Sequence, residues 1–169
     1  MKILETERTI LREVTKDDAE FILDLLNQPS FIRYIGDRNL RNVTQARDYI
    51  ESRFMESYKK FGFGLWAVEL KETNALVGIC GFVKRDSLPD ADIGFAFLPQ
   101  YERKGYAYES ADGVMKYGRS VLNLKRVLAI TSKDNESSGR LLGKLDFVFE
   151  RLIKLPPDDE ELKLFSSHL

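Results

Sequence analysis

Apolar and polar positions follow two different periods along this chain. Residues 8–14 alternate between apolar and polar side chains, which predicts a half-buried strand. Residues 19–26 carry apolar side chains at helical spacing, so they are predicted to form an amphipathic helix. Residues 44–60 predict a second helix, and the polar stretch between the two helices, residues 27–42, is predicted to be a loop with a short turn.

The middle of the chain changes to short apolar runs that are rich in β-branched residues. Residues 64–70 and 75–84 predict a hairpin, because only four residues separate them. Residues 91–98 predict a further strand, which ends at Pro99 because proline cannot donate to a sheet ladder.

A strand–helix–strand unit follows. Small residues recur on one face of a predicted helix over residues 104–119, and residues 126–131 form the next apolar run. Such a unit is expected to be right-handed, with its two strands parallel. A short helix over residues 135–145 and two closing strands, residues 147–153 and 161–167, complete the pattern.

These elements predict an α/β fold with α+β character at its ends. We expect a central mixed sheet of about seven strands, mostly antiparallel, with helices on both faces. No linker-like run interrupts the pattern, so residues 1–169 are predicted to be a single domain. A hydrophobic fraction of 43% is ample for one core and excludes a disordered chain.

Charge and the rarer residues argue against several classes of function. The 26 basic and 27 acidic residues leave no overall positive field to hold nucleic acid or an anionic membrane. The N-terminus shows no signal peptide, and no stretch approaches the roughly 18 apolar residues of a membrane span. The single Cys80 and single His168 argue against disulfides, a Ser-His-Asp triad and a histidine-rich metal site. We therefore expect a cytoplasmic protein without a metal, a nucleic acid or a membrane as partner.

The start of the helix at residues 104–119 is the most informative site. A helix N-terminus has unpaired N–H groups and a positive dipole end, and here Arg103 and Lys104 add charge while Gly105 permits close approach of a ligand. These features together suit a phosphate or diphosphate. A plain solvent-exposed helix start explains the same residues equally well.

Residues 102–107, with Glu109 after them, resemble the acetyl-CoA loop of the GCN5-related N-acetyltransferases (GNAT), which usually reads Gln/Arg-x-x-Gly-x-Gly/Ala. Gly105 and Ala107 match the two small positions. Glu102 stands where Gln or Arg is usual, and Arg103 replaces a glycine that many relatives have.

Three further segments resemble the ribosomal-protein-alanine acetyltransferase branch of that family. Residues 6–12 are similar to its opening strand and residues 92–95 to its fourth strand. Residues 135–147 are similar to its Asn-x-x-Ser helix, with Asp146 where glycine is usual. The resemblance spans nearly the whole chain.

The resemblance implies a site for acetyl-CoA as co-substrate. The fourth and fifth strands are expected to splay apart around the pantetheine arm. Main-chain groups near three residues would bind the arm and polarise the thioester: Phe95, Phe97 and Leu98. Backbone amides would hold the diphosphate at Arg103, Lys104, Gly105, Tyr106 and Ala107, and Asn135 would bind the arm.

Proton transfer has two candidate groups. The resemblance implies that Asp92, on the fourth strand, is the base that takes a proton from the amine, although an exposed carboxylate or a salt bridge explains it too. Many relatives use a tyrosine as the acid for the thiolate, but Leu142 occupies that position. Ser138 is the acid that the branch implies, or else an ordinary first-turn serine.

The predicted function is therefore direct acetyl transfer from acetyl-CoA to a primary amine, on a protein N-terminus or a small molecule, by a monomer or homodimer. The alternatives are a non-catalytic acetyl-CoA-binding module and an unrelated phosphate-ligand binder. The acidic residues 156–161 are interpreted as a solvated turn, or as an acidic lip that attracts a cationic amine.

Overall fold

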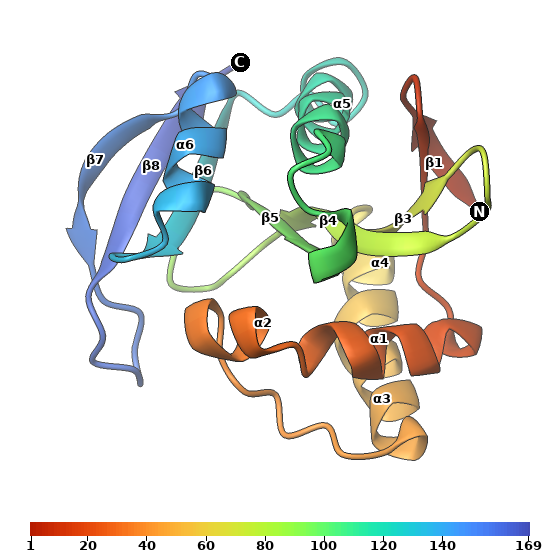
Figure 1. Cartoon of the computed structure of the whole chain (residues 1–169). Helices are drawn as coiled ribbons and strands as arrows, with labels where there is room; N and C mark the ends of the chain where they lie inside the picture. Colours follow the sequence, from red (N-terminus) through yellow and green to blue (C-terminus); the bar gives the residue numbers. More distant parts are fainter.

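A computed structural model describes residues 1–169, which form one open sheet with helices on both faces (Figure 1). The sheet has eight strands in the order β1-β2-β3-β4-β5-β6-β8-β7. The strands are β1 (Lys2–Glu5), β2 (Thr9–Arg12), β3 (Leu65–Leu70), β4 (Leu76–Val83), β5 (Asp92–Phe97), β6 (Arg126–Ser132), β7 (Val148–Ile153) and β8 (Leu162–His168). All pairs are antiparallel except β5 with β6. The mixed, mostly antiparallel sheet is confirmed.

The helices occupy both faces of this sheet. They are α1 (Ala19–Leu26), α2 (Pro29–Tyr34), α3 (Val43–Tyr49), α4 (Glu56–Phe61), α5 (Tyr106–Ser120) and α6 (Glu136–Lys144). The short 3-10 helices η1 (Lys16–Asp18) and η3 (Pro99–Tyr101) and the π-helix η2 (Ile50–Met55) complete the set. Figure 1 shows α5 above strands β3 to β5 and α1 to α4 below them, while α6 lies beside β6 and β8. Residues of α6 belong to the same core cluster as α5. None of these helices has the length and apolar character needed to cross a membrane.

Three elements differ from the sequence prediction. The sheet has an eighth strand, β1, at its edge. This strand was not predicted, because its segment offers only two adjacent apolar residues and no clear alternation. The segment predicted as a loop contains α2, which begins at a proline and is anchored by buried Phe31. The helix predicted over residues 44–60 runs through α3, η2 and α4, and η2 is a π-helical segment.

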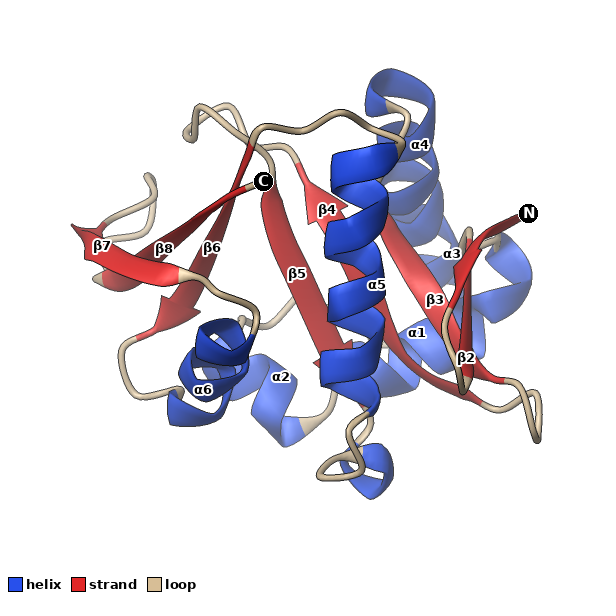
Figure 2. Cartoon of the chain, turned by 90° about the horizontal axis from the view of Figure 1, so that it is seen from above, coloured by secondary structure: helices blue, strands red, loops and turns tan.

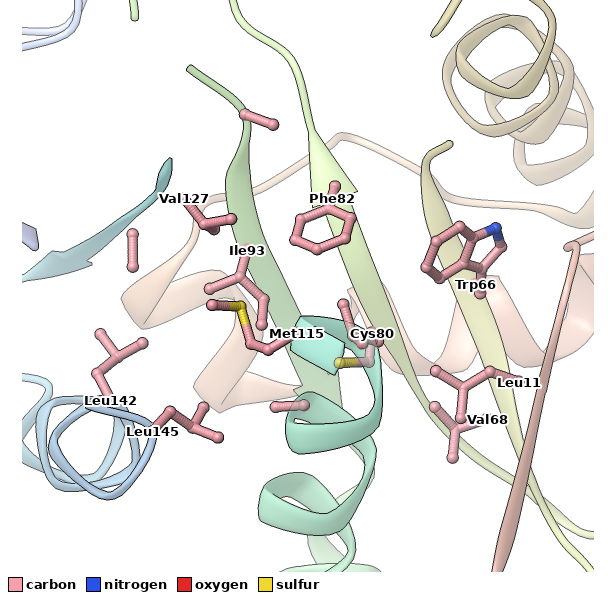
Figure 3. Packing of buried hydrophobic residues seen from close by; sticks show 14 of the residues in the cluster. Leu11, Trp66, Val68, Cys80, Phe82, Ile93, Met115, Val127, Leu142 and Leu145 are labelled. Atoms are coloured by element: carbon pink, nitrogen blue, oxygen red, sulfur yellow. The ribbon is translucent and has the colours of Figure 1, made fainter. Parts of the chain in front are cut away.

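The larger core lies between the sheet and α5. It buries the ring of Trp66 edge-on against Phe82 and against Tyr117 of α5. Met115 of α5 belongs to the same cluster, and Cys80 is fully buried there (Figure 3). Helix α5 packs closely, since a Cβ at Gly118 would lie 2.7 Å from the Phe82 ring. A second cluster packs α1 and α3 against the opposite face of the sheet.

Strands β5 and β6 part shortly after they meet. They pair only between Asp92 and Leu128, whereas β5 pairs with β4 at six positions and β6 pairs with β8 at seven. Figure 2 shows the two strands diverging toward the end of the sheet where α5 begins. The splayed parallel pair expected from the resemblance is therefore present.

Candidate active site

The edge of β5 beyond Asp92 faces the gap between β5 and β6. The Leu98 N–H donates to the Val77 carbonyl at 2.9 Å, toward β4. Successive residues of an antiparallel ladder point alternately to and from the partner strand, so the N–H and C=O groups of Phe95 and Phe97 point away from β4. These groups lie where the sequence analysis expected them. Leu98 differs, because its N–H is already bonded within the sheet and offers no donor to the gap.

The loop from β5 to α5 is held in an unusual conformation. After η3, Arg103 has a φ of 61° and Gly105 a φ of 84°, so both lie in the left-handed region. Glycine accepts this conformation without a Cβ penalty, whereas an arginine is strained there. Gly105 is the N-cap of α5, so the chain enters the helix at the residue that the motif singled out.

A row of unpaired donors lies along this loop. The backbone N–H groups of residues 103–108 donate to no acceptor in the chain, and the first return bond joins the Glu109 N–H to the Gly105 carbonyl at 3.0 Å. The side chains of Arg103 and Lys104 are exposed beside them. Unpaired amides at the positive end of a 15-residue helix are suited to binding a diphosphate.

Arg8 and Glu109 hold the other side of the loop. The Arg8 backbone N–H and its Nε each donate to the Glu109 carboxylate at 2.7 Å, and Nη1 donates to the Lys104 carbonyl at 3.0 Å. Burial raises the pKa of Glu109, but hydrogen bonds from Thr6 and Arg8 outweigh it, so the pKa lies below its usual value. Sequence reasoning assigned these residues no role. The only available signal was that each falls within a segment that resembles the family.

Asp92 lies at the closed end of the gap, where β5 still pairs with β6. Its side chain is only 2% exposed, and Arg85 Nε donates to Oδ1 at 3.0 Å. Burial raises the pKa of Asp92 to about 6, against the attraction of Arg85. Asp92 therefore forms a salt bridge with Arg85 in this structure.

Asn135 and Ser138 open helix α6 beside the wide end of the gap. Asn135 is the N-cap, and its Oδ1 accepts from the Ser138 N–H at 3.2 Å. The Asn135 amide nitrogen and the Ser138 hydroxyl make no hydrogen bond within the chain, and both residues are partly exposed. Both groups are therefore available to a ligand. Leu142, on the same helix, is 1% exposed and belongs to the core.

An acidic rim lies next to Asn135, at the wide end of the gap between β5 and β6. A shallow depression of about 430 Å³ is lined by Lys133, Asp134, Lys154, Asp159, Glu160 and Glu161. Both lysines are paired, at 3.2 Å with Glu161 and at 3.1 Å with Asp159. Arg33 of α2 pairs with Asp134 at 3.2 Å. No group of three or more His, Cys, Asp or Glu side chains is arranged to hold a metal ion.

Comparison with known proteins identifies the family. The model of the acetyltransferase (GNAT) domain matches residues 8–148. The chain is 36% identical to the uncharacterized N-acetyltransferase YoaA of Bacillus subtilis (strain 168) over 153 residues, which cover 90% of this chain and 86% of that protein. It is 28% identical to the spermidine N(1)-acetyltransferase of Escherichia coli (strain K12) over 146 residues, which cover 83% and 73% of the two chains.

Solved structures share the fold. The structure of RimL, a ribosomal L7/L12 alpha-N-protein acetyltransferase in complex with coenzyme A, superposes with a TM-score of 0.85 at 13% identity, covering 100% of this chain and 98% of that one. Members of the GNAT family use acetyl-CoA as acyl donor. The chain therefore belongs to the GNAT acetyltransferase family and is an N-acetyltransferase of that type.

Proposed function

We propose that this protein transfers the acetyl group of acetyl-CoA directly to a primary amine, on a protein N-terminus or on a small molecule. The observation that carries the proposal is the position of the unpaired amides of residues 103–108 at the end of the gap between β5 and β6. A diphosphate at these amides directs the pantetheine arm into the gap. There the arm reaches main-chain groups of Phe95 and Phe97 and the side-chain amide of Asn135.

The chain's own groups then have separate roles in the transfer. A main-chain N–H of β5 donates to the thioester oxygen and stabilises the negative charge that develops there. Asp92 receives the proton lost by the amine. A water molecule carries this proton, because the Asp92 side chain is buried beside Arg85 and does not contact the amine itself. Ser138 supplies a proton to the departing thiolate. A free α-amino group, with a pKa near 7.7–8.0, needs little assistance from a base.

A non-catalytic acetyl-CoA-binding module is the second candidate. Two observations favour it: Asp92 is paired with Arg85, and buried Leu142 replaces the tyrosine of many relatives. In such a module the amides of residues 103–108 still bind the diphosphate of acetyl-CoA, but Asp92 and Ser138 transfer no proton.

The acceptor also divides into two classes. Glu160, the one carboxylate of the rim without an ion-pair partner, favours a cationic amine. The similarity to a spermidine N(1)-acetyltransferase supports a polyamine, and the fold shared with RimL supports a protein N-terminus.

Ligand-induced stabilisation and turnover together test the proposal. Acetyl-CoA at 100 times its dissociation constant should stabilise the protein by about 2.7 kcal/mol. Free thiol should then be released with spermidine or with peptides bearing a free N-terminus, and mass spectrometry should detect a gain of one acetyl group on the acceptor. Stabilisation without thiol release on any acceptor would favour the binding module, and no stabilisation would refute both.

A further inference from the structure

We infer that Arg8 and Glu109 are positioning residues that keep the loop of residues 102–105 in its diphosphate-binding conformation. The inference rests on the proposed function. It concerns two residues that are 101 positions apart in the sequence. Arg8 contacts the loop from the turn between β1 and β2, and Glu109 of α5 holds Arg8 there.

Arg8 is fixed in place by Glu109. Glu109 lies in the first turn of α5, and its carboxylate accepts from the Arg8 backbone N–H, from Arg8 Nε and from the Thr6 hydroxyl. The Glu109 side chain is only 18% exposed, while that of Arg8 is 44% exposed. A carboxylate with three donors holds both the turn between β1 and β2 and the guanidinium group against the start of α5.

Arg8 in turn orients one peptide of the loop. Its Nη1 donates to the Lys104 carbonyl at 3.0 Å. The peptide between Lys104 and Gly105 is trans, since the only cis bond joins Pro156 and Pro157. In a trans peptide the C=O and the N–H point in opposite directions. The contact therefore turns the Gly105 N–H away from Arg8 and into the row of unpaired amides.

The loop of residues 102–105 needs a contact of this kind to keep its conformation. Arg103 has a left-handed φ of 61°, a conformation that non-glycine residues keep only when their surroundings enforce it. The Arg8 guanidinium lies 4.4 Å from the centre of the Tyr106 ring. Its Nη2 lies only 3.1 Å from the position that a Cβ on Gly105 would take. Arg8 thus fills the space behind the loop and restricts its movement.

The test compares Arg8→Ala and Glu109→Gln with a matched control. Arg126→Ala removes a similar ion pair, in which Nε donates to Asp90 at 2.9 Å, and Arg126 lies where β6 begins, before the gap opens. Dissociation constants are measured at 25 °C for acetyl-CoA and for S-acetylpantetheine, which lacks the diphosphate and the nucleotide.

Arg8→Ala should weaken acetyl-CoA binding about tenfold, which corresponds to about 1.4 kcal/mol. Glu109→Gln should weaken it less, because an acceptor oxygen remains, and Arg126→Ala should stay within twofold of the wild type. S-acetylpantetheine should bind Arg8→Ala and the wild type equally.

The inference is overturned if Arg8→Ala binds acetyl-CoA as the wild type does, or if it loses affinity for both ligands to the same degree. The second outcome would indicate a general effect on the fold. Wild-type protein that binds no acetyl-CoA would instead refute the proposed function, and the inference with it.

Discussion

Replacing Gly105 by alanine tests the diphosphate loop most directly, and the chain supplies its own control. Gly105 has a φ of 84°, and Gly62, at the end of α4, has a φ of 76°. An added Cβ at Gly62 meets nothing within 4 Å, whereas at Gly105 it would lie 3.1 Å from Arg8 Nη2. The two substitutions therefore impose the same backbone strain, but only Gly105→Ala also displaces Arg8.

The expected loss of stability follows from the backbone alone. A left-handed conformation costs an L-residue roughly 1–2 kcal/mol. Reduced freedom of the unfolded chain offsets roughly 0.4–1 kcal/mol of this, which leaves about 1 kcal/mol. For a chain of this length, both variants should melt about 2–4 °C below the wild type.

Ligand binding should then separate the two variants. Gly62→Ala should keep the wild-type dissociation constant for acetyl-CoA, whereas Gly105→Ala should raise it about tenfold or more. Calorimetric titration and melting curves with and without acetyl-CoA measure both quantities. If Gly105→Ala bound acetyl-CoA as well as Gly62→Ala does, the assignment of the diphosphate to this loop would be wrong.

Three further substitutions test other parts of the structure. The pKa of Asp92 is raised from 3.8 to about 6, so the stability it contributes is fully present below about pH 4 and lost as the pH rises through 6. Urea denaturation should accordingly show Asp92→Asn gaining stability relative to the wild type between pH 4 and pH 7, and an unchanged difference would contradict the raised pKa. Ser138→Ala should lower kcat without changing the dissociation constant of acetyl-CoA, and wild-type turnover would remove Ser138 as the acid. Leu142→Ala should reduce the unfolding free energy by about 2–5 kcal/mol in the same urea assay, because this buried side chain leaves a cavity; a loss below 1 kcal/mol would mean that the core closes around it.

Hydrophobic periodicity was sufficient to predict the long elements of the fold. The seven predicted strands are all present, since each carries an alternating or continuous apolar pattern over several residues. The strand β1 was missed because its only two apolar residues are adjacent and show no alternation, and the helix α2 was missed because its six residues make fewer than two helical turns. Their positions depend on packing and pairing with distant parts of the chain.

The candidate site was predictable only where a motif is local. Gly105 and the amides around it could be found from one short segment, because a helix start is a local property. The interpretation of Leu98 required the register of β5 on β4, which a sequence does not display. The contact of Arg8 with Glu109 likewise joins two segments 101 residues apart, and no periodicity links them.

The single pairing between β5 and β6 also divides the sheet mechanically. Five strands stand on one side of it, and the three strands β6, β8 and β7 stand on the other. A ligand that spans the gap adds the bonds which the two strands do not make with each other. It therefore acts as a cross-link between two halves that the backbone ladder joins only at one end. Their amide hydrogens should exchange as two cooperative units without the ligand and as one unit with it.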